Sequence, residues 1–128
     1  MSPAIPVSWG ELIDKITILE IKSELLESEV SRHNVRRELE QLSAVAAAAE
    51  KDNPKIASLK VSLKHANQTL WQIEDDIREK EAAKCFDQEF VDLARAIYRT
   101  NDERGRIKQA INALLKSEVT EEKQYSRY

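Results

Sequence analysis

The chain has 128 residues, of which 34% are charged and 41% hydrophobic, with only 2 glycines and 3 prolines. A chain of this size forms one domain with a buried core, and this composition favours long amphipathic helices over a turn-rich β protein. The formal net charge of −3 gives no electrostatic case for a nucleic-acid partner. A single cysteine, Cys85, allows neither an intrachain disulfide nor a thiolate zinc cluster. With no signal-peptide pattern and no apolar window long enough to span a membrane, we expect a cytoplasmic protein.

The first predicted helix covers residues 8–49. Ser8-Trp9-Gly10-Glu11 is a capping box, in which the Ser8 hydroxyl accepts from the Glu11 amide and the Glu11 carboxylate accepts from the Ser8 amide. Residues 12–21 are apolar on more than one face, which is typical of a helix buried nearly all round. The apolar spacing slips across residues 31–34, where the residues are middling helix formers, and a kink or a break there is the alternative. We favour one continuous helix.

Two further helices are predicted at residues 54–83 and 87–116, followed by a charged tail at 117–128. Asn53 suits the N-cap of the second helix and Pro54 its first position. Apolar residues in the second helix recur every three or four residues, as in helices that pack lengthwise. Asp87 suits the N-cap of the third helix. Gly105, in the middle of the third helix, indicates a close approach of another element or a bend.

Short connections near residues 51 and 86 predict an all-α fold: a long, coiled-coil-like antiparallel hairpin with the third helix packed on the second, a three-helix bundle. Residues 8–20, the most apolar helical segment, then project past the end of the second helix. This segment needs a cover, either the same segment of a second chain or the start of the third helix with the tail folded over it. We favour the second chain and predict a homodimer. The predicted interface residues are Trp9, Leu12, Ile13, Ile16 and Leu19.

A polar cluster is predicted between the second and third helices. Antiparallel pairing brings Asn101 and Arg104 near Trp71, and brings Asp75 and Arg78 near the start of the third helix. Arginine gives bidentate contacts and tryptophan a stacking face, so these five residues are candidates to bind a small anionic or sugar-like ligand. The alternative, which we favour, is a set of interhelical salt bridges that fixes the register.

No catalytic, metal or cofactor site is predicted. A helical di-metal site needs Glu-x-x-His pairs, whereas Glu29 and His33 are four residues apart and His65 has no glutamate at that spacing. Cys85 has no histidine nearby to act as a base, and two glycines cannot form a phosphate-binding loop. The arginines of the third helix are interspersed with acidic residues, which indicates a solvated face rather than a nucleic-acid surface. We therefore lean against an enzyme.

Three segments resemble a bacterial domain-of-unknown-function family of small helical proteins: SWGELIDKITILEIK at residues 8–22, LWQIEDDIR at 70–78 and IYRTNDER at 97–104. The likeness continues toward the C-terminus and spans nearly the whole chain. It implies a helical domain without an assigned activity, in a bacterial surface-glycan context and sometimes attached to a larger protein.

The sequence thus predicts a non-catalytic helical interaction or scaffold module that self-associates through its N-terminal helix and has another protein as a further partner. The alternative is a helical domain that binds a small ligand in the polar cluster. Neither reading identifies the partner or the ligand.

Overall fold

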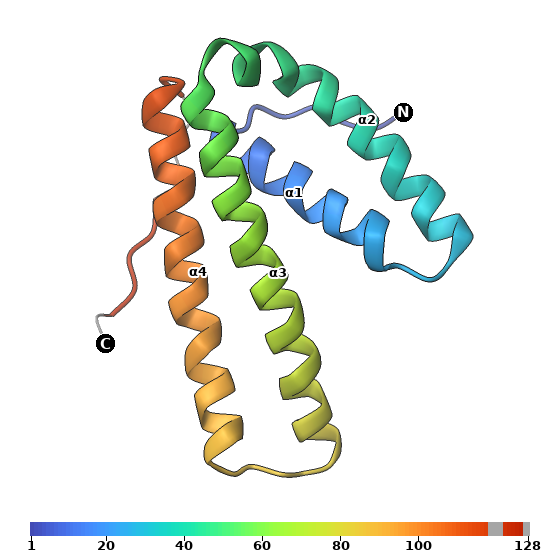
Figure 1. The fold of residues 1–128 in the computed structure, drawn as a ribbon, viewed down its shortest axis with the longest axis vertical. Coiled ribbons are helices and arrows are strands. Elements are labelled where there is room, and N and C mark those ends of the chain that lie inside the picture. Colours follow the sequence, from blue (N-terminus) through green and yellow to red (C-terminus); the bar gives the residue numbers. More distant parts are fainter. Residues whose placement is uncertain (118–121, 127–128) are drawn as a thin grey trace.

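The computed structural model describes residues 1–117 and 122–126, which form four α-helices and no strand (Figure 1). The helices are α1 (Trp9–Leu25), α2 (Glu29–Asp52), α3 (Pro54–Ala82) and α4 (Gln88–Leu114). The all-α class is confirmed, but there are four helices where three were expected. Of the predicted tail, residues 118–121 and 127–128 lie outside the described residues.

The N-caps predicted at the starts of α1, α3 and α4 are confirmed. In each, a side-chain oxygen accepts a hydrogen bond from a backbone amide two or three residues later: Ser8 from Glu11 at 3.1 Å, Asn53 from Lys55 at 3.2 Å, and Asp87 from Phe90 at 3.0 Å. Each cap satisfies an amide that the first turn of a helix leaves without an intrahelical partner. These local interactions explain why the predicted helix starts agree with the structure.

The prediction of one continuous helix over residues 8–49 is wrong. α1 ends at Leu25, the backbone of Leu26 is extended, and Ser28 caps α2 by accepting from the Ser31 amide at 3.3 Å. Residues 31–34, where a break was the alternative, are helical. Serine favours a cap over a helix interior because its hydroxyl competes for backbone hydrogen bonds. Ser28 therefore gives α2 a start of its own, and α1 can fold back.

This break changes how the helices are arranged. α1 lies between α2 and the α3–α4 pair and packs against all three, whereas α2 diverges from α3 after their shared turn (Figure 1). The long hairpin predicted between residues 8–49 and 54–83 therefore does not form. The predicted antiparallel pairing of the last two helices is confirmed as α3 and α4, which make the most extensive helix–helix contact among the described residues.

The core lies where α1 crosses α3 and α4. Ile13 and Ile16 of α1 are 0% exposed and belong to one cluster with Ile56, Leu63 and Ile111, which are also 0% exposed. Burying an isoleucine side chain stabilises a fold by about 1.5–3 kcal/mol. The most apolar segment of the chain therefore forms the centre of the fold.

The residues predicted to form a dimer interface are thus covered within one chain. Leu12, Ile13, Ile16 and Leu19 are at most 8% exposed, and Trp9 packs half-buried against the same cluster. An interface through these side chains required them to be exposed on a single chain. The fold-back of α1 removes that requirement. The segment is covered within the chain, but by α3 and the C-terminal half of α4 rather than by the start of that last helix.

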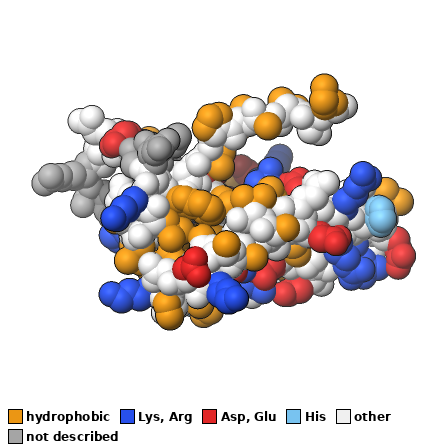
Figure 2. Space-filling view, turned by 90° about the horizontal axis from the view of Figure 1, so that it is seen from above, with side chains coloured by type: hydrophobic (Ala, Val, Ile, Leu, Met, Phe, Trp, Pro, Cys, Tyr) orange, Lys and Arg blue, Asp and Glu red, His pale blue; other side chains and the backbone are white. Residues whose placement is uncertain are grey.

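Residues 1–7 are extended and exposed, and they stand clear of the helices in Figure 2. On the face seen there, Lys and Arg side chains are interspersed with Asp and Glu, so the described residues form no continuous basic surface on it. None of the described helices is long and apolar enough to cross a membrane.

The lower part of the α3–α4 hairpin extends beyond α1 and α2 (Figure 1). We call this part the arm: residues 74–82 of α3, residues 88–99 of α4 and the connection between them. At its end, Lys80 Nζ lies 2.9 Å from Asp87 Oδ2 and 3.0 Å from Glu89 Oε2. These ion pairs join the last turn of α3 to the first turn of α4.

Gly10 lies at a close contact between α1 and α4. Its amide donates to Asn112 Oδ1 at 2.7 Å, and a Cβ at this position would lie 2.5 Å from the Lys108 carbonyl oxygen. At Gly105 a Cβ would meet only Lys123 Cδ, at 4.0 Å. The close approach considered for Gly105 is therefore found at Gly10.

We expect Gly10→Ala to lower the free energy of unfolding by about 1–3 kcal/mol, because the methyl group forces the two helix backbones apart. Gly105→Ala is the matched control and should stabilise the chain by roughly 0.5–1 kcal/mol, because alanine loses less conformational entropy in a helix. Urea unfolding measures both. Similar changes of the same sign would contradict the close contact at Gly10.

The Lys80 ammonium group and the Phe90 amide lower the pKa of Asp87 to about 2. Because the pKa is lowered, the ionised cap stabilises the arm at neutral pH, and this contribution is lost as the pH falls through about 2. We expect Lys80→Met to raise the pKa of Asp87 toward the ordinary aspartate range. Lys84→Met, which removes a nearby charge that forms no ion pair with Asp87, should change it little. NMR titration of the Asp87 carboxyl carbon measures both, and equal responses would contradict the role of Lys80.

Candidate binding site

A buried polar network joins α1 to α3. Asp14 and Thr17 of α1 are 3% and 0% exposed, and Asn67 of α3 is 6% exposed. Asn67 Nδ2 donates to Asp14 Oδ1 and to Thr17 Oγ1, both at 2.9 Å. The Thr17 hydroxyl in turn donates to the Asp14 carbonyl oxygen at 2.7 Å. Each polar group is matched because a buried polar atom without a hydrogen bond is costly.

Arg104 extends this network to α4. Its Nη2 donates to Asp14 Oδ2 at 2.6 Å, and its Nη1 donates to Asn101 Oδ1 at 2.8 Å. The Asp14 carboxylate therefore has one partner from α3 and one from α4, and its charge is balanced by a guanidinium. Both terminal nitrogens of Arg104 are engaged within the chain, and its Nε is buried. Arg104 is consequently poorly placed to bind an external anion in a bidentate way.

A hollow of about 280 Å³ lies beside this network, between α1, α3 and α4. We call it the wedge pocket. Half of its lining is apolar and half polar: Ile18, Ile21, Leu70 and Trp71, with Asn67, Glu74, Asn101 and Arg104. It lies at the inner end of the arm, because α1 leaves the α3–α4 hairpin at this level.

The structure brings together three of the five residues predicted to bind a ligand. Trp71, Asn101 and Arg104 all line the wedge pocket. Asp75 is exposed and lies outside it, as does Arg78, whose side chain is 79% exposed and bonds to Glu74 Oε2 at 3.1 Å. Asp75 follows Glu74 by about 100° around the helix, so the two carboxylates point in different directions.

Asp14 was not predicted to join this cluster, and Asn67, which the antiparallel pairing places near Asn101 and Arg104, was not among the five candidates. The signal for Asp14 is a carboxylate within a segment that is otherwise apolar on more than one face, since such a charge needs a partner when it is buried. Asn67 follows Ala66 in the apolar stripe of α3, and its amide gives no indication of which helix it contacts. Their meeting depends on the fold-back of α1, which the sequence pattern does not contain.

A second hollow, of about 590 Å³, separates α4 from residues 122–125. Lys123 Nζ lies 3.4 Å from Asp102 Oδ1 and donates to the Asn101 carbonyl oxygen at 3.5 Å. Asn101 and Arg104 line this hollow as well as the wedge pocket. They therefore form a wall between the two hollows.

The described residues hold no group of three or more His, Cys, Asp and Glu side chains placed to bind a metal ion. Cys85 is half-buried at the end of the arm, where its thiol donates to Asp87 Oδ2 at 3.4 Å and lies 3.8 Å from Lys80 Nζ. No hydrogen bond among the described residues links the Cys85 thiol to a histidine that could act as its base.

We expect Arg104→Ala to lower the free energy of unfolding by about 3–5 kcal/mol, because it leaves the Asp14 carboxylate buried without its cation. Arg78→Ala is the matched control: its ion pair with Glu74 is exposed, and its loss should cost less than about 1 kcal/mol. Urea unfolding measures both variants. A loss in Arg104→Ala no larger than in Arg78→Ala would show that Arg104 does not hold the fold together.

The comparisons with known proteins agree with the resemblance seen in the sequence. The chain matches the family model DUF6165, a family of unknown function, over residues 4–128. No curated protein and no solved structure matches it. The match covers nearly the whole chain, including the four helices described above. The chain therefore belongs to the DUF6165 family.

Proposed function

We propose that the chain is a non-catalytic helical interaction module, and that its binding surface is the side of the arm below α1. The observation that carries this proposal is that α1 covers only the upper part of one side of the α3–α4 hairpin (Figure 1). The same side continues along the arm, where no described helix covers it.

Helical periodicity identifies the residues that lie on this side of the arm. Leu70 and Asn101 line the wedge pocket below Ile18 and Ile21 of α1. Positions seven residues away lie on the same side of a helix. The side therefore continues from Leu70 to Ile77 on α3, and from Asn101 to Ala94 on α4.

We call this surface the arm face. Its central residues are half-buried between the two helices: Ile77, Phe90, Ala94 and Ile97. Beside them Val91 is 44% exposed, and Phe86 at the end of the arm is 59% exposed. A row of apolar side chains bordered by polar ones is typical of a surface that packs against another helix. A partner on the arm face would extend the packing that α1 provides above it.

The interaction proposed here does not use the N-terminal helix. Leu12, Ile13 and Ile16 are in the core, so exposing them to a second chain would require α1 to leave the hairpin. That movement would also separate Asp14 from Arg104. Both costs favour binding through the arm, which is already open.

A second candidate function is small-ligand binding in the wedge pocket. Trp71 offers an aromatic face there, with Glu74, Asn67 and Asn101 as hydrogen-bonding groups. Because Asp14 already neutralises Arg104, a neutral sugar-like ligand fits this lining better than an anionic one.

Photo-crosslinking in the native cell tests the interaction module. We expect benzoylphenylalanine at Ala94, on the arm face, to give an adduct heavier than the chain. Asp92 is exposed and lies about 160° away around α4, so the same probe there is the matched control and should give little adduct. Absence of any adduct from Ala94, or equal adducts from both positions, would contradict the proposed surface.

A further inference from the structure

The α3–α4 hairpin carries opposite charges at its two ends. Where α1 covers the hairpin, three basic side chains contact acidic ones of α1: Lys64 with Glu24 at 3.0 Å, Arg104 with Asp14 at 2.6 Å, and Lys108 with Glu11 at 3.5 Å. Below α1, the arm (residues 74–99) includes eight acidic and five basic residues, a formal excess of three negative charges. The upper part of the hairpin thus contacts the acidic side chains of α1 through basic groups. The arm below has an acidic border of its own.

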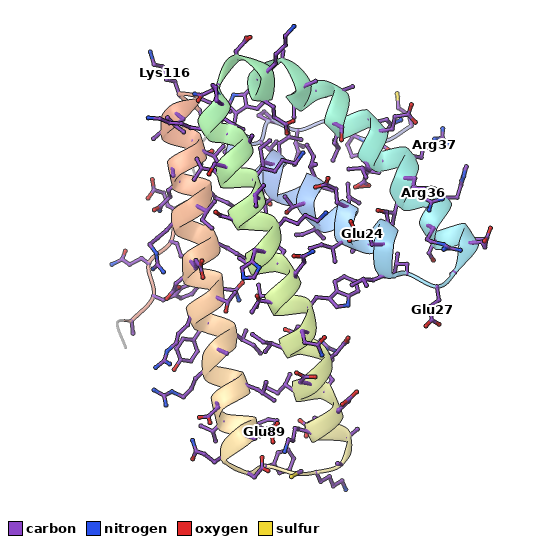
Figure 3. The ribbon with its side chains drawn as sticks, viewed as in Figure 1. Glu24, Glu27, Arg36, Arg37, Glu89 and Lys116 are labelled. Atoms are coloured by element: carbon purple, nitrogen blue, oxygen red, sulfur yellow. The ribbon has the colours of Figure 1, made fainter. Side chains whose placement is uncertain are left out.

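The acidic excess of the arm is not balanced within the described chain. Arg78 pairs with Glu74, and Lys80 pairs with Asp87 and Glu89. Four further carboxylates of α3 form no ion pair with a described residue: Asp75, Asp76, Glu79 and Glu81. Glu81 lies seven residues after Glu74 and so continues the side of α3 that lines the wedge pocket. In Figure 3, Glu89 lies at the end of the arm, whereas Arg36 and Arg37 project from α2 on the other side of α1.

We propose that the arm face binds an amphipathic helix of another protein, with an apolar stripe and basic residues on its borders. This inference rests on the proposed function and identifies the kind of partner. The apolar stripe would pack on Ile77, Ala94 and Ile97, as α1 packs on the hairpin above. The basic residues would face Glu74 and Glu81, which lie seven residues apart on the side of α3 that lines the wedge pocket. The α3 part of the arm rises about 13 Å, which matches two to three turns of the bound helix.

A second copy of this chain fits the arm face less well than a basic amphipathic helix does. Two arms packed face to face bring two acidic borders together, and like charges across an interface are unfavourable. A second copy of α1 is also unsuitable, because the residues by which it contacts the hairpin are acidic: Glu11, Asp14 and Glu24. The charge pattern therefore favours a basic helix from a different protein.

The test uses the full chain and an 18-residue model helix of leucine and lysine, with the leucines on one face. We expect it to bind with chemical-shift changes centred on Ala94 and Ile97, measured by NMR, and with an affinity measured by calorimetry. A leucine–glutamate helix of the same pattern should bind roughly tenfold or more weakly, since about two border charges each contribute up to ~1 kcal/mol. A scrambled leucine–lysine peptide, which has no apolar face, should not produce these shifts.

Reversing the charge of acidic residues on the arm tests whether the leucine–lysine helix binds there. The double variant Glu74→Lys/Glu81→Lys should weaken binding of the leucine–lysine helix by roughly tenfold. Glu27→Lys/Glu40→Lys makes the same change of net charge outside the arm, at two exposed residues, and should leave the affinity nearly unchanged. Equal losses in both variants, or shifts centred on α2, would overturn the inference.

The outcomes separate this inference from the proposed function. A crosslinked adduct from Ala94 to another protein, together with no binding of the leucine–lysine helix, would leave the interaction module standing and overturn the basic-helix partner. An adduct with twice the mass of the chain would identify a second copy as the occupant and also overturn it. Absence of any adduct would contradict the interaction module itself.

Discussion

The buried carboxylate of Asp14 determines where α1 lies on the rest of the fold. A charge that is 3% exposed needs partners, because an unmatched buried charge costs several kcal/mol. Asn67 and Arg104 supply them from two different helices. A shift of α1 by one turn along the hairpin would leave both Asp14 and Arg104 unmatched. The network therefore selects one register, whereas the isoleucines around it would tolerate several.

The direction of α1 then decides which part of the hairpin is open. α1 diverges from α3 toward its C-terminal end and runs to the side of α2 (Figure 1), so its contacts with the hairpin stop near Leu70 and Asn101. Above this level α3 and α4 contribute fully buried side chains to the core, among them Ile56, Leu63 and Ile111; below it Ile77, Ala94 and Ile97 are half-buried. One α3–α4 pair thus supplies both the core and the arm face. The difference between these two regions comes from α1 rather than from the apolar pattern of α3, which is continuous from Ile56 to Ile77.

Local signals were sufficient to predict much of the fold. The periodic apolar stripe of α3 and the caps at Ser8, Asn53 and Asp87 depend on neighbouring residues, and the structure agrees with them. The break after Leu25 was missed because Leu26 and Glu27 are good helix formers, whereas residues 31–34 include serine, histidine and asparagine; helix propensity therefore places the weak point later in the chain than the structure does. That error led to an uncovered N-terminal segment and hence to a predicted dimer interface at Leu12 and Ile16.

The candidate site was predicted in part for the same reason. Trp71, Asn101 and Arg104 meet because the pairing of α3 and α4 follows from a short connection. Asp14 comes from a helix whose position the sequence did not reveal, and it changes the chemistry of the cluster. With Asp14 present, Arg104 is a structural cation, and the wedge pocket has no free positive group that could attract an anion.

The reversal of charge along the hairpin also limits what the fold can do by itself. α1 contacts the hairpin through Asp14 and Glu24, and these groups match Arg104 and Lys64 but not the acidic arm. Exchange of α1 between copies, a common route to dimers of helical proteins, would offer it only the hairpin position that it already occupies. The arm therefore stays open in a single chain, both because α1 runs away from it (Figure 1) and because α1 has the wrong charge. A surface that the chain's own helices do not cover is available to another protein, and its acidic border restricts which helices bind there.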